Sequence, residues 1–280
     1  MSPVLESGAS VWSTRYMQVR AILRLELRKN LFGRRSIPTY LLAMLPIPIF
    51  VAVAVLPQGD WLEEGLGSAS RMYGIIFETF MLRAVIFLGC IAVFTNLFRG
   101  EVLDRSLHYY FLAPVRREVL VIGKYLSGLT MTILLFGGMV VVTFALLYSA
   151  FGPSAGFEYF FGGPGMGHLV SYLSVTVLAC LGYGSVFLIL GLLFRNPILP
   201  GIVVMGWEFI HFLLPPLLKK ISVIHYLKGF LPLPMSEGPF AVLVEPPPAW
   251  LAVGGLLAFT AVVLVLSGWR IRRMEIRYSE

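Results

Sequence analysis

Six long apolar segments constrain this chain more than any other feature of its sequence. They cover residues 38–57, 75–98, 119–149, 169–194, 198–217 and 249–269. A helix needs about 20 apolar residues to cross the hydrocarbon core of a bilayer, and each segment meets or approaches that length. Because 58% of the 280 residues are hydrophobic and 13% are charged, one soluble core could not bury them. The sequence therefore predicts an all-α membrane protein, a single domain (1–280) with six transmembrane helices.

The positions of lysine and arginine predict the orientation of the chain. If both termini are cytoplasmic, 17 of the 22 basic residues lie on the cytoplasmic side, four lie on the other side, and Arg83 lies within a span. Cytoplasmic loops are enriched in these residues. We therefore expect a multi-pass inner-membrane protein with both ends in the cytoplasm, and we interpret the net charge of +7 as a topology signal. No polar stretch is long enough for a nucleic-acid-binding domain, so no nucleic-acid partner is expected.

Residues 11–35 precede the first span and show helical periodicity. Apolar side chains recur every three or four residues beside a basic stripe, as in helices that lie in the interface between anionic headgroups and acyl chains. The alternative is a basic flank that only sets the topology. The apolar positions are Trp12, Tyr16, Val19, Leu23 and Leu27, and the basic stripe is Arg20, Arg24 and Arg28.

The predicted loops on the outer side are 58–74, 150–168 and 218–248, and none is long enough to form a domain of its own. The last is rich in proline and apolar residues, which makes it too apolar for a disordered linker. It is compatible with short re-entrant helices that dip into the outer leaflet.

The segment between the second and third spans, residues 98–124, has the features of a docking element. Glu101, Asp104 and Arg105 begin a predicted short helix that continues through Leu107 and a run of aromatic residues. Pro114 should end this helix, because proline disfavours helix at the preceding residue. Such a helix, held between two spans on the cytoplasmic side, suits contact with a soluble protein. The alternative is an ordinary basic loop.

At these residues the sequence resembles the permease subunits of ABC type-two exporters. The resemblance implies that residues 100–113 form the coupling helix, which sits in a groove of the ATPase subunit, and that residues 11–35 form the amphipathic connecting helix. One departure is that Arg105-Ser106 stands where the family more often has Gly-Thr. The matching positions are Glu101, Arg105-Ser106-Leu107, Leu112-Ala113-Pro114, Arg116 and Gly123-Lys124, and the expected coupling residues are Glu101, Asp104, Arg105, Ser106, Leu107, Pro114 and Arg116.

The same resemblance implies a partner that hydrolyses ATP. Gly123-Lys124 is not a phosphate-binding loop of the Walker A type, because Glu118 and Tyr125 stand where that motif needs Gly and Ser or Thr. We therefore expect no catalysis and no cofactor in this chain, with ATP and Mg bound by a separate ABC ATPase subunit. The resemblance also implies a second permease, in a homodimer or a heterodimer.

Three ionisable residues lie within the predicted spans and are functional candidates, because charge is costly in a bilayer. Arg83 is 16 residues from Arg99, while Glu208 and His211 are 13 and 16 residues beyond Arg195. These separations place all three at similar depths, so an ion pair or hydrogen bond between Arg83 and Glu208 is a hypothesis. Glu208 and His211 either line the outer half of a transport path or form a polar cluster that holds two spans together.

Two other classes of function were considered. An intramembrane enzyme would need a catalytic set such as H-E-x-x-H, G-x-S-x-G with partners, or paired aspartates, and none is present. The remaining histidines share no metal-ligand spacing, so no metal site is expected. An ion-coupled secondary transporter, working without an ATPase, stays open as the alternative, although it should show related halves. The expected function is export of a hydrophobic or amphiphilic substrate.

Overall fold

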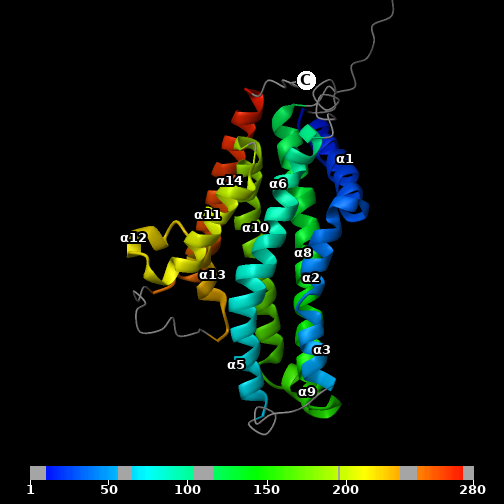
Figure 1. Ribbon diagram of the computed structural model, residues 1–280, viewed down its shortest axis with the longest axis vertical. Helices are drawn as coiled ribbons and strands as arrows, with labels where there is room; N and C mark the ends of the chain where they lie inside the picture. Colours follow the sequence, from blue (N-terminus) through cyan, green and yellow to red (C-terminus); the bar gives the residue numbers. More distant parts are fainter. Residues whose placement is uncertain (1–10, 56–64, 104–115, 195, 234–244, 274–280) are drawn as a thin grey trace, which may run out of the picture.

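The computed structural model describes residues 11–55, 65–103, 116–194, 196–233 and 245–273. Its long helices lie side by side along one axis, and the described residues contain no strand (Figure 1). The first part of the chain forms α1 (Val11–Phe32), η1 (Arg34–Ser36), α2 (Ile37–Met44), α3 (Ile47–Val55), α5 (Leu66–Ile76), the π-helix η2 (Phe77–Ile86) and α6 (Phe87–Leu103). The second part forms α8 (Arg117–Ser149), α9 (Pro153–Phe161), α10 (Gly165–Leu193), α11 (Ile198–Phe209), η3 (Ile210–Leu213), α12 (Pro216–Lys219), α13 (Val223–Leu227), η4 (Lys228–Phe230) and α14 (Ala249–Arg272).

Five helical stretches within the described ranges are long and apolar enough to cross a membrane. They correspond to the first, second, third, fourth and sixth predicted spans. The first is broken between α2 and α3 at Pro46, which lacks an N–H and cannot continue a helix. The five stretches are Arg34–Val55, Leu66–Glu101, Arg117–Ser149, Gly165–Leu193 and Ala249–Arg272.

The predicted fifth span, 198–217, is wrong in length. The apolar helix there covers only Ile198–Leu213, tightens into a 3-10 turn from Ile210, and ends at Leu214, which has extended backbone. Pro215 and Pro216 explain the early end, because each lacks an N–H donor and disfavours helix in the residue before it. The count of six full spans is therefore not confirmed.

This shortened helix lets the chain turn round part-way along the bundle. Figure 1 shows α11 beginning near the end where α10 stops, with α12 and α13 beside the bundle at part of its height. Helix α14 then returns to the end where α11 began. The expectation of short helices in 218–248 matches α13 and η4, whereas α9 lies in a predicted loop and was missed. As a result, α1 and the last turn of α14 lie at one end of the molecule.

The second span is much longer than predicted. It runs without a break from α5 through η2 into α6, and its 36-residue stretch from Leu66 to Glu101 is roughly 54 Å long. A hydrocarbon core is about 30 Å thick, so this helix extends beyond it. The π-helical turn in the middle is wider than an α-helical turn and brings residues five apart onto one side. This spacing matters for the charged residues described below.

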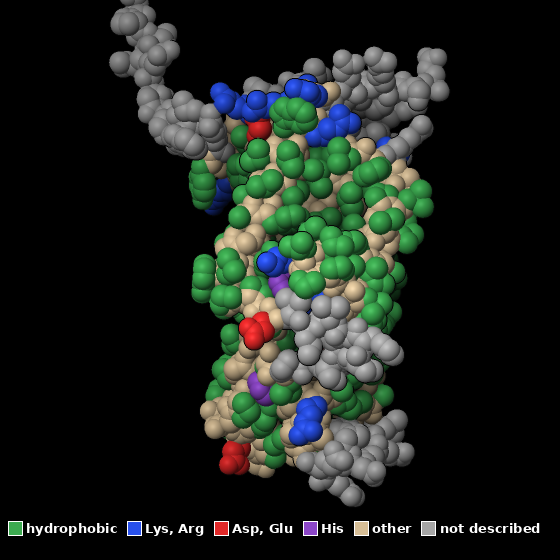
Figure 2. Space-filling view, turned by 90° about the vertical axis from the view of Figure 1, so that its left-hand side faces the viewer, with side chains coloured by type: hydrophobic (Ala, Val, Ile, Leu, Met, Phe, Trp, Pro, Cys, Tyr) green, Lys and Arg blue, Asp and Glu red, His purple; other side chains and the backbone are tan. Residues whose placement is uncertain are grey.

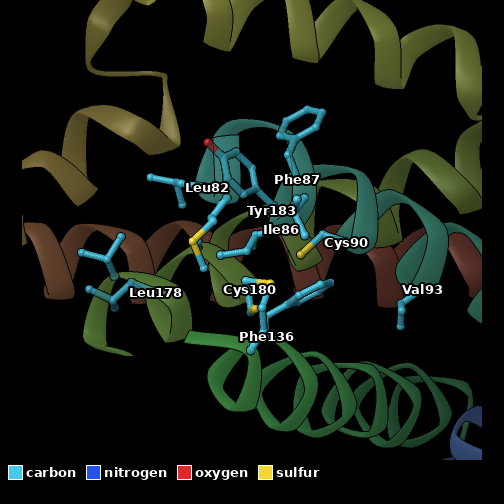
Figure 3. Packing of buried hydrophobic residues seen from close by; sticks show 14 of the residues in the cluster. Leu82, Ile86, Phe87, Cys90, Val93, Phe136, Leu178, Cys180 and Tyr183 are labelled. Atoms are coloured by element: carbon cyan, nitrogen blue, oxygen red, sulfur yellow. The ribbon is translucent and has the colours of Figure 1, made fainter. Parts of the chain in front are cut away.

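The core lies where α6, α8 and α10 meet. Figure 3 shows Cys90, Phe136 and Cys180 gathered between these helices, and all three side chains are fully buried. Both cysteines are free thiols that pack as small apolar groups. Helices α6 and α10 approach closely at Gly191, where a Cβ would lie 2.9 Å from the carbonyl oxygen of Thr95. Small residues at such contacts let helices pack tightly in membranes.

The surface separates apolar from basic side chains. Figure 2 shows hydrophobic side chains along much of the length of the visible face and most of its Lys and Arg side chains at one end. We call this the basic end. It contains the second half of α1, the last turn of α6, the start of α8 and the last turn of α14, which are joined by the ion pairs Lys29–Glu101, Lys124–Glu101 and Arg272–Glu118.

Candidate functional site

A buried ion cluster joins three helices at the basic end. The Nζ atom of Lys124 on α8 lies 2.9 Å from Oε1 of Glu26 on α1 and 2.6 Å from Oε1 of Glu101 on α6. Lys29, also on α1, places its Nζ atom 2.9 Å from the same Oε1 of Glu101. The side chains of Lys124, Glu26 and Glu101 are 0%, 1% and 1% exposed. We call these four residues the ion cluster.

The ion cluster is electrically balanced, with two ammonium groups and two carboxylates. Burial of a single charge costs several kcal/mol, and only close partners offset that cost. The pairing therefore requires α1, α6 and α8 to stay in register, because a shift of any one helix would leave a buried charge behind. Lys29 closes the cluster towards solvent, since its side chain is 44% exposed.

Helix α1 docks on α8 through close apolar and polar contacts as well. A Cβ at Gly123 would lie 2.7 Å from Cγ2 of Ile22, so only glycine allows the two helices to approach this closely. About two turns further along α1 and one turn further along α8, Nδ2 of Asn30 donates a hydrogen bond of 2.9 Å to Oγ of Ser127. The Gly-Lys pair that resembles the family pattern therefore serves packing through Gly123 and charge pairing through Lys124.

The predicted coupling residues divide into three groups. Glu101 is described, and its carboxylate points into the bundle towards Lys124 instead of outwards. Arg116 is described and exposed at the start of α8. The others, Asp104, Arg105, Ser106, Leu107 and Pro114, lie in 104–115, outside the described residues. Of the predicted coupling helix, residues 100–103 continue α6.

The predicted amphipathic segment forms helix α1, and the side of this helix that packs against the bundle overlaps the predicted apolar positions. Tyr16 is 69% exposed, whereas Ile22, Leu27 and Leu31 pack against the core and Leu23 is partly buried. The side chain of Trp12 is outside the described residues. The basic stripe is exposed as expected, and a groove of about 860 Å³ runs along it, lined by Arg20, Arg24 and Arg28 among others.

Glu26 is the functional residue that the helical pattern missed. It is four residues after Ile22 and belongs to the side of α1 that faces α8, so it interrupts an apolar stripe. A buried acid in such a stripe needs a partner, and Lys124 is the corresponding base near the start of an apolar span. Together, an acid in an apolar stripe and a base in an apolar span indicate a buried ion pair. The spacing of the two residues in the sequence does not show that they are in contact.

A second charged site lies at Glu208, near the end of α11. Its Oε2 atom accepts hydrogen bonds from the Tyr183 hydroxyl at 3.2 Å and the Ser222 hydroxyl at 2.8 Å. The main-chain N–H of Val223 donates to Oε1 at 3.0 Å, and that of Ile224 donates to Oε2 at 3.3 Å. The Glu208 side chain is buried, and its partners are neutral donors from α10 and from the start of α13.

The hypothesis that Arg83 meets Glu208 is correct for a hydrogen bond and wrong for an ion pair. Nη1 of Arg83 donates to the main-chain carbonyl of Glu208 at 3.4 Å, while Nη2 pairs with Oε1 of Glu78 at 3.4 Å. Glu78 and Arg83 are five apart, the spacing that the π-helix brings together. An α-helical wheel separates them, so sequence analysis missed this pair.

His211 is buried in η3, and its ring centroid lies 6.3 Å from that of His225 in α13. Both rings therefore belong to the contact between the end of α11 and the chain that follows it. The side-chain hydrogen bonds of Glu208 join the same segments to each other and to α10, and the hydrogen bond from Arg83 adds a contact with the second span. Within the described ranges, no three His, Cys, Asp or Glu side chains are grouped closely enough to hold a metal ion.

These features define the class of the protein: a multi-pass helical membrane protein with paired charges buried between its helices. Residues 22–210 match the family described as ABC-2 family transporter protein. The match covers more than half of the chain, and the chain belongs to this family of membrane transport components. A search of curated proteins found no match. The matched residues include the whole ion cluster, Arg83 and Glu208.

Proposed function

We propose that the chain is the membrane-spanning permease subunit of an ATP-driven ABC exporter. A separate ABC ATPase subunit binds ATP and Mg, and the permease moves a hydrophobic or amphiphilic substrate out of the cytoplasm. Membership of the ABC-2 transporter family is the observation that carries this proposal. The Walker A pattern is missing at Gly123-Lys124, and that absence supports a separate source of ATP hydrolysis.

The basic end is the proposed docking surface for the ATPase. The predicted coupling helix, 100–113, begins within the last turn of α6, and Arg116 is exposed where the chain enters α8. The ion cluster fixes Glu101 to α8 and α1. A displacement of the coupling helix by the ATPase therefore moves α1, α6 and α8 as one rigid unit, which is how packed elements transmit switching motions.

Close packing carries this motion further into the bundle. The contact between Thr95 and Gly191 couples α6 to α10, and the Tyr183 hydroxyl couples α10 to Glu208. Glu208 in turn holds the start of α13, where the chain reverses. We infer that the turning segment after α11 follows the movement of α6 and acts at the outer half of the path.

The proposed assembly contains a second permease, identical or related, in the inner membrane, with both termini in the cytoplasm. The distribution of lysine and arginine supports this orientation. The common position of α1 and the end of α14 supports it too, because both termini then face one side. The apolar helices offer a path with few charges, which suits a lipid-like substrate better than an ion.

The proposal is tested by purifying the tagged chain from native membranes in a mild detergent. We expect an ABC ATPase subunit to co-purify and vanadate-sensitive ATP hydrolysis to be recovered. Replacement of Arg116 by Glu should reduce the bound ATPase severalfold, whereas Arg71→Glu, on α5, should not. If the purified chain transports a lipid-like dye without ATPase and in response to an ion gradient, the exporter proposal is wrong and the secondary-transporter alternative is correct.

A further inference from the structure

A polar pocket at the basic end borders the ion cluster, because Glu26 and Lys29 line it, and extends beyond the cluster. Its volume is about 360 Å³, and it is formed by the end of α1 with η1 and the start of α2 on one side and by α6 on the other. Three basic side chains line it: Lys29, Arg34 and Arg35. We call it the inner pocket. It differs from the groove along the arginine stripe of α1, although Lys29 and Gly33 line both.

Among the basic side chains of the inner pocket, that of Arg34 has no acidic partner within the described ranges. Glu26 lines the pocket, but its carboxylate pairs with Lys124, and Glu101 is shared between Lys124 and Lys29. Within the described ranges, the side chain of Arg34 forms no hydrogen bond and no ion pair. An exposed arginine beside two further basic side chains is suited to a bidentate anion such as a phosphate.

Other polar groups in the inner pocket can donate hydrogen bonds. The amides of Asn30 and Asn96 face it, and each uses one N–H, donating to Ser127 Oγ and to the Ala92 carbonyl respectively. Each amide therefore has a second N–H to offer. Arg35 places Nη1 of its guanidinium against Gly100 of α6, so a side chain at position 100 would displace this arginine. Donors from α1, η1 and α6 thus converge on one space.

The floor and the surroundings of the inner pocket are apolar. Val93, Leu97 and Met131 line it and are almost fully buried. Helix α2, whose Thr39 lines the pocket, exposes the apolar side chains of Ile37 and Leu41 and belongs to a candidate span. A charged head held by arginines, with acyl chains lying against α2, satisfies both kinds of surface.

We propose that the inner pocket binds the phosphate of an anionic phospholipid from the adjacent leaflet. Arg34 and Arg35 hold the phosphate, Lys29 and the amides of Asn30 and Asn96 contact the rest of the headgroup, and the acyl chains lie along α2. Basic pockets between helices on the cytoplasmic side recognise lipid headgroups in this way. The bound lipid bridges η1 to α6 and stabilises their contact. This site does not depend on ATP-driven export.

The test uses the full chain in nanodiscs that contain phosphatidylcholine alone or with a minority of phosphatidylglycerol. Native mass spectrometry after release should show preferential retention of phosphatidylglycerol, and the melting temperature should be higher in the mixed discs. Removing each of the two arginines should lower the preference about fivefold. The double variant Arg34→Gln with Arg35→Gln should lose both the retained lipid and the thermal shift. The control, Arg20→Gln on the exposed stripe, should keep them.

Three results would overturn the proposal. An equal loss of retained phosphatidylglycerol in Arg20→Gln would mean a general attraction to anionic membranes. Unchanged retention of this lipid in the double variant would place its binding site elsewhere. An equal thermal shift with inorganic phosphate or glycerol phosphate in phosphatidylcholine discs would assign the site to a free phosphate. If the double variant does not fold, Asn96→Leu removes a headgroup donor and Arg34→Lys keeps the charge. Asn96→Leu should then lower the preference more than Arg34→Lys, and the reverse order would contradict the site.

Discussion

Two buried carboxylates, Glu101 at the basic end and Glu208 at the turning segment, are balanced in different ways. Glu101 is paired with the ammonium groups of two lysines, whereas Glu208 accepts hydrogen bonds from two hydroxyls and two main-chain N–H groups. The first arrangement joins three separate helices. The second holds a short segment to the helix that precedes it. The same chemical group therefore holds three helices in register in one place and fixes one short segment in the other.

The difference has an energetic basis. A buried ion pair contributes little net stability compared with apolar packing, but loss of one partner is severe, because it leaves an uncompensated charge. Removal of a carboxylate that is held by neutral donors lowers the free energy of unfolding less, because an unpaired hydroxyl or N–H group costs less than an unpaired buried charge. The basic end should therefore be the more sensitive of the two regions to a single substitution.

The largest effect is expected for Lys124→Met. It leaves Glu26 and Glu101 buried with less positive charge nearby, so the free energy of unfolding should fall by about 3–5 kcal/mol. The measurement is equilibrium unfolding in detergent, followed by circular dichroism. The matched control is Lys29→Met in the same cluster, which should cost at most about 1 kcal/mol because Lys29 is partly exposed. Equal losses of unfolding free energy in the two variants would show that the buried charges of the ion cluster do not hold the three helices together.

The next effect is expected for Glu208→Ala. The substitution removes the acceptor for Ser222, Val223 and Ile224, and should cost about 1.5–3 kcal/mol in the same unfolding assay. Ser222→Ala removes one of these bonds and should cost about 0.5–1.5 kcal/mol. If Glu208→Ala leaves stability unchanged but abolishes ATP-dependent transport, Glu208 lines the transport path. The interpretation that it fixes the segment after α11 would then be wrong.

A third effect tests the packing that accompanies the ion cluster. Gly123→Ala places a methyl group against Ile22 and should cost about 1–3 kcal/mol, because the two helices must separate. The control is Gly138→Ala on the same helix, where no atom outside the neighbouring helix backbone lies within 4 Å of the new methyl group. It should leave the melting temperature unchanged or slightly higher. Equal destabilisation by both would mean that the helix itself, not its contact with α1, is affected.

The smallest effect is expected at the exposed ion pair of the basic end. Arg272 pairs with Glu118, but their side chains are 64% and 31% exposed. Water screens such a pair, so Arg272→Ala should cost no more than about 1 kcal/mol. High salt should reduce the difference further. A loss as large as that of Lys124→Met would show that burial does not distinguish the two pairs.

Sequence patterns predicted those parts of the fold that depend on local composition. Five apolar spans and the helix at the N-terminal side follow from hydropathy and periodicity, and proline chemistry explains the break at Pro46. The error in the fifth span has a local cause as well. Pro215 and Pro216 end the helix at Leu213, before the prolines themselves, whereas the apolar composition of 198–217 extends through them.

The contacts between helices could not be predicted in the same way. Glu101 and Lys124 were each singled out, yet their pairing with Glu26 depends on how α1 lies against α8. The pairing of Arg83 with Glu78 depends on a π-helix, which no periodicity indicated. The four donors around Glu208 come from segments 14 to 25 residues away along the chain. Such contacts are tertiary, and residue spacing carries no signal for them.

The central claim is that the basic end receives an ATP-hydrolysing partner. The most direct test is photo-crosslinking in native membranes, with a photoreactive residue in place of Arg116 at the basic end or of Phe157 in α9, at the opposite end of the bundle (Figure 1). We predict that the first probe forms an adduct with an ABC ATPase subunit and that the second does not. An adduct at Phe157, or an ATPase that crosslinks at neither end, would contradict the account.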